Sequence, residues 1–180
     1  MIIISYLLHL TTFSDTLAGD FGGAVYLFDY NDGTGNFEYT QKLTPDPDFL
    51  DDLNRYGSSV SISGNYVVVG DPAADKGGSN AGAAYVFQKG DSEEDSFNFA
   101  FSLVSPIPAV SALFGHSVAV NSNGVIAIGA KGDRIARGSV YLFKPNGADW
   151  DHVFTIAPDD VAQSFPNVGN FGWDVAIDDS

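Results

Sequence analysis

The chain has 180 residues, 44% of them hydrophobic and 13% aromatic, which is enough apolar material for a folded core rather than a disordered acidic tail. Its 23 acidic against 8 basic residues give a net charge of −15, so binding to nucleic acid or to anionic membrane surfaces is not expected. Because the chain has no cysteine, disulfides, thiol catalysis and cysteine-ligated zinc are excluded.

The first apolar stretch, residues 1–8, has two interpretations. A secretory signal would need a basic residue before the apolar run and a small-residue cleavage site, and neither is clear here. The alternative is a degenerate pair of inner strands, because Leu8-His9-Leu10 lies 16 to 18 residues before Tyr26, as Val67-Val68-Val69 does before Tyr85. We favour the strand interpretation. No apolar run approaches the length that spans a membrane, so no membrane insertion is expected.

Two markers recur along the chain with nearly one period. An aromatic signature occurs three times, 59 and then 56 residues apart: Tyr26-Leu27-Phe28, Tyr85-Val86-Phe87 and Tyr141-Leu142-Phe143. An aromatic residue followed by glycine recurs after 58 and 57 residues: Tyr56-Gly57, Phe114-Gly115 and Phe171-Gly172. Two independent markers indicate duplicated units. Residues 1–180 therefore form one repeat region with units at about 1–56, whose first half is degenerate, 57–114, 115–171, and the start of another at 172–180.

The third unit shows the predicted strands of one repeat most clearly. Residues 117–120 alternate, a turn follows at 121–124, and residues 125–128 are apolar on both faces. A polar loop leads to a third strand at 139–143. The fourth strand has large residues at alternate positions, which predicts one buried face, so His152 is expected to be packed with a hydrogen-bond partner. These alternating residues are Trp150, His152, Phe154 and Ile156.

Four antiparallel strands per unit of about 57 residues, with apolar inner strands, predict sheets stacked face to face as in propeller blades. No stretch has helical periodicity over ten residues or more, which disfavours a helical solenoid. We therefore expect an all-β fold, a partial β-propeller of about three four-stranded antiparallel blades.

The residues around the repeated glycines resemble the FG-GAP repeat of integrin-α-like β-propellers. The segments that resemble it are 114–120 with 128–131, echoed by 56–62 with 69–72, whereas the first copy keeps only its second half from Gly22. The resemblance implies a seven-bladed ring, which needs about 400 residues, so this chain is not long enough to close one. It would then be a fragment of a longer protein, a subunit whose copies complete a ring, or an open stack of blades. We favour a fragment, because the last copy stops inside its first strand.

No motif predicts catalysis, so we do not expect an enzyme. Residues 115–119 superficially match a nucleophile elbow, which needs a strand before the serine and a helix after it. Here a loop precedes Ser117 and a strand follows it, and Asp174 stands at the equivalent position of the last copy. Ser117 is therefore interpreted as a residue of the repeat.

Calcium is the one metal that the sequence leaves open, and no cofactor is expected otherwise. In integrin-like propellers an aspartate-rich loop joins the first and second strands, but in this chain residues 63–65 and 121–124 are too short and lack a carboxylate. The candidate ligands are Asp71, Asp75 and Asp133, in the loops between second and third strands. The alternative is that these residues serve ordinary turns.

Positions at which the repeats differ are the best candidates for recognition, because packing demands are shared among the copies. Ser58, His116 and Trp173 each follow the repeated glycine. The resemblance places their loop, and the loop that holds Arg134 and Arg137, on the partner-binding side. The candidate partner-binding residues are His116, Trp173, Arg134 and Arg137. Aspartates also precede the glycine: Asp46, Asp48, Asp51, Asp52, Asp159 and Asp160. The alternative is a solvated rim of a rigid scaffold.

The resemblance implies a non-enzymatic binding or adhesion module, extracellular or at the cell surface, that presents loops to a protein or carbohydrate partner. It also implies contact with further propeller blades or self-association. One alternative is an accessory propeller domain of a secreted hydrolase or lyase. Another is a purely structural stack of blades, since a fold does not fix a function.

Overall fold

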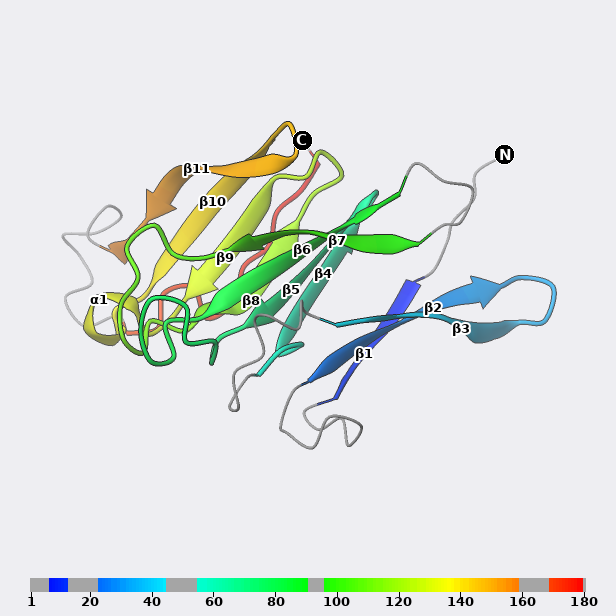
Figure 1. Cartoon of the computed structure of the whole chain (residues 1–180), viewed down its shortest axis with the longest axis horizontal. Helices are drawn as coiled ribbons and strands as arrows, with labels where there is room; N and C mark the ends of the chain where they lie inside the picture. The colour runs from blue at the N-terminus through cyan, green and yellow to red at the C-terminus, as the bar shows by residue number, and fades with distance from the viewer. Residues whose placement is uncertain (1–6, 13–22, 45–54, 91–95, 159–168, 180) are drawn as a thin grey trace.

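The computed structural model describes residues 7–12, 23–44, 55–90, 96–158 and 169–179. These ranges contain eleven strands and one helix of four residues, so the all-β prediction is confirmed. The strands form three antiparallel sheets that follow one another along the chain (Figure 1). The chain is thus a partial β-propeller, and its sheets are the predicted blades.

The first sheet has the order β1-β2-β3, and the other two have four strands each, in the orders β4-β5-β6-β7 and β8-β9-β10-β11. The strands of the first sheet are β1 (Leu7–Thr12), β2 (Ala24–Asn31) and β3 (Asn36–Leu43). Those of the second are β4 (Ser59–Ser63), β5 (Tyr66–Asp71), β6 (Ala83–Lys89) and β7 (Phe97–Leu103). Those of the third are β8 (Phe114–Val120), β9 (Ile126–Ala130), β10 (Ser139–Asn146) and β11 (Asp149–Ile156).

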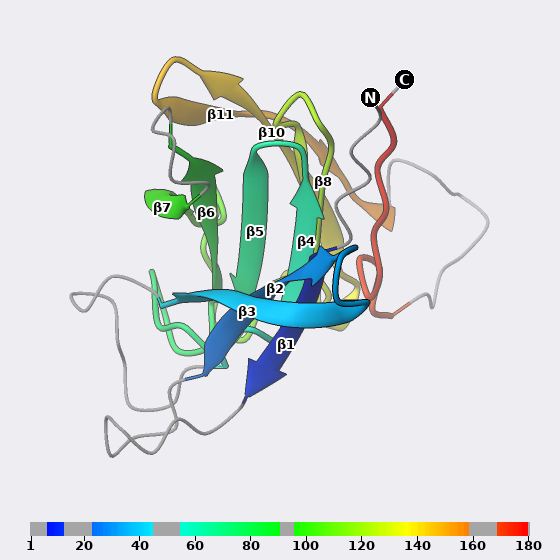
Figure 2. The same cartoon turned by 90° about the vertical axis from the view of Figure 1, so that its right-hand side faces the viewer.

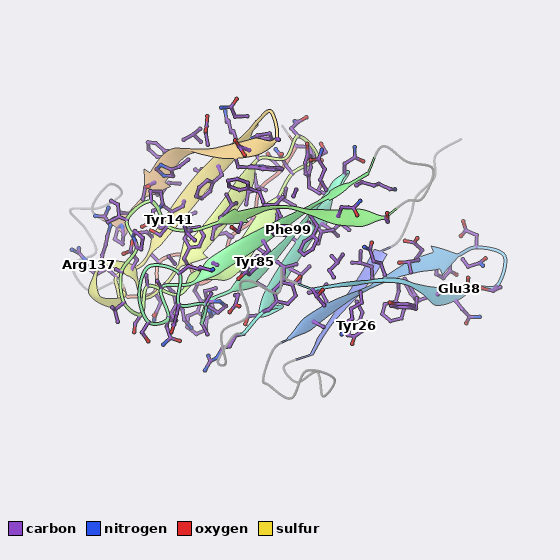
Figure 3. The ribbon with its side chains drawn as sticks, in the orientation of Figure 1. Tyr26, Glu38, Tyr85, Phe99, Arg137 and Tyr141 are labelled. Carbon is purple, nitrogen blue, oxygen red and sulfur yellow. The ribbon has the colours of Figure 1, made fainter. Side chains whose placement is uncertain are left out.

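The register of the sheets identifies which strand position is not filled in the first sheet, within the described ranges. In each sheet the repeated tyrosine pairs with an apolar residue of the preceding strand: Tyr26 with Leu10, Tyr85 with Val69, and Tyr141 with Ile128. Strand β1 is therefore the second strand of its blade, which confirms the strand interpretation of Leu8-His9-Leu10. Figure 3 shows the three tyrosines in successive sheets. Within the described ranges, no innermost strand pairs with β1.

The core lies between the sheets rather than within any one of them. In Figure 2 the first sheet lies in front of the second. Alternate residues of β5 serve opposite interfaces, because Val67 and Val69 pack toward the first sheet and Val68 toward the third. The second strand of this blade is consequently apolar on both faces, as predicted. The second interface contains the fully buried Phe114, whose ring centroid lies 5.5 Å from that of Tyr141.

The outer strands differ from the prediction, because a β-bulge interrupts their alternation. In all three sheets the register shifts by one residue, at Thr40, Ala100 and Val153. A bulge turns the following side chains to the other face of the sheet. In β7, Phe97 therefore packs toward the first sheet, whereas Leu103 packs toward the third.

The prediction of one continuous buried face on the outer strands is thus wrong. Tyr39 and Phe154 are each 58% exposed. His152 is exposed rather than buried, although its ring packs edge to face on Phe143 and its Nε2 lies 2.8 Å from the Thr155 hydroxyl, so the predicted hydrogen-bond partner is present. Trp150 is the buried aromatic of β11, and its indole N–H donates to the Gly124 carbonyl over 3.0 Å.

The helix α1 (Asp133–Ala136) lies in the polar loop between β9 and β10. A helix of four residues is too short for a periodic pattern, so the sequence gives no sign of it. No helix in the described ranges is long and apolar enough to cross a membrane.

The last described segment, residues 169–179, continues the blade pattern without forming a sheet. Phe171 makes a parallel bridge with Gly138, and Phe171, Val175 and Ile177 pack against Ala127 and the rest of the outer face of the third sheet. The red trace in Figure 1 runs along this sheet. The segment thus takes the place of the first strand of a further blade, as its sequence predicts.

The repeated glycines mark the points at which one blade touches the next. A Cβ on Gly70 would overlap the Gly115 carbonyl oxygen, and a Cβ on Gly129 would overlap that of Gly172. The glycine at the end of the second strand of one blade therefore lies directly against the glycine of the aromatic-glycine marker of the next repeat, and no side chain fits between them.

Candidate functional site

Equivalent serines beside these glycines join the blades by hydrogen bonds. The Ser59 hydroxyl donates to the Gly115 carbonyl over 2.9 Å, and the Ser117 hydroxyl donates to the Gly172 carbonyl over the same distance. Ser117 is buried, at 6% exposure. These contacts give Ser117 the structural role in the repeat that its position predicts.

The three positions that follow the repeated glycine come together in one groove. The groove has a volume of about 330 Å³ and lies where the inner strands begin. It is lined by Ser58, Ser59, Val60, His116, Ser117, Val118, Trp173 and Asp174. Two of the four predicted partner-binding residues, His116 and Trp173, are therefore neighbours. Below, this hollow is called the inner groove.

Trp173 is the most prominent side chain of the inner groove, with 58% of its surface exposed. The His116 ring meets it edge to face, with 5.0 Å between the ring centroids. The Lys131 ammonium lies 3.8 Å from the centroid of the indole, a geometry for a cation–π interaction. The indole is therefore held between two side chains of the third blade while much of it faces solvent.

Burial lowers the pKa of His116 below its usual 6.5, and the nearby Lys131 ammonium lowers this pKa further. Burial likewise lowers the pKa of Lys131, with a smaller contribution from the positive charge of Arg55. Both shifts disfavour the protonated form of the group. The positive charges of Lys131 and Arg55 therefore act close to the inner groove, in a chain whose net charge is −15.

We expect a nuclear magnetic resonance titration to give a His116 pKa below 6.5, and Lys131→Gln to raise it. Because burial is the larger cause, the pKa of the variant should stay below 6.5. Because folding lowers the pKa of this imidazole, the unfolded chain takes up the proton at a higher pH than the native state does. The free energy of unfolding should therefore fall slightly as the pH drops through about 6.5. An unchanged or lower His116 pKa in Lys131→Gln would contradict the assigned contact.

A second hollow adjoins the inner groove and holds another predicted partner-binding residue. Its volume is about 730 Å³, and its lining is Ala109, Val110, Ser111, Leu113, Lys131, Gly132, Asp133, Arg134 and Asn170. Lys131 lines this hollow, and its ammonium lies over the ring of Trp173, which lines the inner groove. Arg134 is exposed, and its Nε–H donates to the Ser139 hydroxyl over 3.2 Å. Below, this hollow is called the loop hollow.

Arg137 differs from the other three predicted partner-binding residues, because it lines neither of these two hollows. It is half-buried just beyond α1 (Figure 3), and its carbonyl accepts the Phe171 N–H over 2.9 Å. This residue thus helps to hold the terminal segment against the third blade.

The three candidate calcium ligands do not converge. Asp71 is fully buried and accepts the backbone N–H groups of Arg55 and Ala73 at 2.8 and 3.2 Å. Asp75 accepts the Asn80 N–H at 2.7 Å, and one Asp133 oxygen accepts the Tyr141 hydroxyl, also at 2.7 Å. The described residues contain no group of three or more acidic or histidine side chains that could hold a metal ion. Calcium binding through these aspartates stays a prediction without a common site.

Two kinds of candidate site residue remain: predicted aspartates that lie outside the described residues, and one residue that the sequence analysis did not select. The aspartates that precede the repeated glycines lie outside the described residues. The missed residue is Lys131, which lines the loop hollow and lies over the Trp173 ring. Lys131 directly follows Gly129-Ala130 and begins the loop that holds Arg134. This position is the sequence signal that could have identified Lys131 as a candidate site residue.

Stacked four-stranded sheets joined through repeated glycines define the chain as a partial propeller. Residues 38–87, from β3 to β6, match the family model of the FG-GAP repeat. The chain therefore carries an FG-GAP repeat, as its markers predict. No curated protein matches the chain.

Proposed function

We propose that the chain is a non-enzymatic binding or adhesion module, outside the cell or at its surface, that presents the inner groove to a protein or carbohydrate partner. The observation that carries the proposal is that Ser58, His116 and Trp173, equivalent positions with different side chains, line one groove. A shared backbone thus displays a varied surface, which is how repeat scaffolds create binding faces. An exposed tryptophan is a typical anchor of such a surface.

The hydrogen bonds of the groove support a binding role over catalysis. A serine nucleophile needs a base that accepts the proton of its hydroxyl. The hydroxyls of Ser59 and Ser117 instead donate to backbone carbonyls of the next inner strand. The His116 ring packs on Trp173, and among the described residues it has no hydrogen bond to a carboxylate that would orient it as a base.

The proposal is tested by offering the full chain to an oligosaccharide array and to a random-peptide display library. We expect Trp173→Ala to weaken binding of the selected ligands by about tenfold or more, because it removes the exposed anchor. Tyr39→Ala is the matched control, since Tyr39 is an aromatic residue with the same 58% exposure on β3 of the first sheet. Equal affinity of Trp173→Ala and Tyr39→Ala, or no ligand in either format, would contradict the proposed function.

A further inference from the structure

The loop between β7 and β8 exposes apolar side chains beside the cationic groups described above. Ile107 is 71% exposed and Val110 is 69% exposed, and Val110 borders the loop hollow together with Ala109 and Leu113. Exposed aliphatic side chains that cluster at a hollow indicate a contact surface more strongly than the same residues scattered singly. The loop hollow thus offers an apolar wall, whereas the inner groove offers Trp173.

Two cationic side chains, Lys131 and Arg134, line the loop hollow, and the charge of Arg55 acts on Lys131. Arg55, Lys131 and Arg134 form no ion pair with an acidic side chain in the part of the chain that the structure describes. The carboxylates that border the hollows are engaged locally. Asp133 accepts the Arg134 N–H and the Tyr141 hydroxyl, and Asp174 accepts the Val175 N–H over 3.0 Å.

Cations with no carboxylate partner among the described residues are unusual on so acidic a chain, which has only 8 lysine and arginine residues against 23 acidic ones. Lys131 is the central one, because it lines the loop hollow and its ammonium lies over the Trp173 ring of the inner groove. Burial, and to a smaller extent the positive charge of Arg55, lowers the pKa of Lys131, and a bound carboxylate would stabilise its ammonium form. The surface therefore favours an anionic ligand that also has an apolar part.

We propose that the inner groove and the loop hollow together dock an acidic peptide segment that carries an aliphatic or aromatic side chain. Its carboxylates pair with Lys131 and Arg134, and its apolar side chain packs against Val110 and Trp173. A peptide fits better than an acidic sugar, because a sugar ring has no aliphatic side chain to cover Val110. The inference rests on the proposed function, since it names the ligand class of the same site.

The test is a selection of random peptides on the full 180-residue chain, followed by affinity measurements on the enriched sequences. We expect enriched peptides to carry Asp or Glu close to Leu, Ile, Val or Phe. Lys131→Glu and Arg134→Glu should each weaken their binding by about tenfold or more, and added salt should weaken it in the native chain. Lys144→Glu makes the same charge change on β10, away from the hollows, and should change affinity by less than about twofold.

The outcomes separate the inference from the proposed function. Enriched peptides that need Trp173 but lack acidic residues would overturn the acidic ligand and leave the binding module standing. If oligosaccharides bind through Trp173 and no peptide is enriched, the acidic peptide is also overturned and the binding module again stands. If Trp173→Ala alters nothing and no peptide is enriched, both fail. Equal effects of Lys131→Glu and Lys144→Glu would also overturn the inference.

Discussion

Replacing Gly70 or Gly129 with alanine should lower the free energy of unfolding by about 3 kcal/mol or more, as severe overpacking does. In each case the new methyl group would overlap the carbonyl oxygen of a glycine in the next blade and the hydroxyl of a serine in the same blade. Neither glycine adopts the left-handed backbone conformation, so the cost comes from the overlap alone. Urea unfolding followed by circular dichroism measures the change.

Gly33→Ala is the control for these substitutions. Gly33 also has an ordinary backbone conformation, and the only atom near its added Cβ is the side-chain oxygen of Asn31. Its cost should stay below about 1 kcal/mol, as for most surface substitutions. If Gly70→Ala and Gly129→Ala cost no more than Gly33→Ala, the blades do not approach each other as closely as described.

Phe114→Ala should cost about 3–5 kcal/mol, the range for truncating a buried phenylalanine. The ring is fully buried between the second and third sheets and meets Tyr141 and Phe143 at centroid distances of 5.5 and 6.1 Å. Truncation would leave a cavity at the interface that joins the two complete blades. Urea unfolding followed by circular dichroism measures this loss of unfolding free energy.

Phe154→Ala removes the same side chain from β11, where it is 58% exposed, and should cost less than about 1 kcal/mol. A comparable loss for the two phenylalanine variants would show that the interface is not the core of the molecule.

The sequence could predict the repeat and its register because both depend on periodic patterns. The apolar residues of β5 and β9 face two interfaces, so neither strand can alternate with polar residues. The spacing of Leu8-His9-Leu10 from Tyr26 could place β1, even though this strand lies at the degenerate end of the chain. A turn of 121–124 between two short strands is likewise a local signal.

Features that depend on the folded context could not be predicted. The bulges at Thr40, Ala100 and Val153 leave the alternation of large residues intact in the sequence while dividing those residues between two faces of the sheet. The exposure of Phe154, which follows the bulge at Val153, results from this shift.

Some contacts of the inner groove could be predicted from the sequence, whereas others depend on how the loops pack in the folded chain. Equivalent positions of successive repeats must lie side by side when blades stack, which placed His116 beside Trp173. The position of Lys131 over the indole depends on a loop conformation, and the sequence carries no pattern for it.

The central proposal is that the blades of this partial propeller associate with further blades or with second copies of the chain. In the described ranges β1 has no inner strand paired with it, and residues 171–177 pack as an inner strand without a sheet. If the missing contact repeats the known register, in which Val60 pairs with Val69 and Val118 with Ile128, Val175 would pair with Leu10.

Size-exclusion chromatography with light scattering on the full chain tests this claim most directly. Because apolar blade faces and open strand edges favour association, we expect assemblies larger than the 19.1 kDa monomer. A stable, compact monomer at all concentrations would contradict the claim that the end blades need partners.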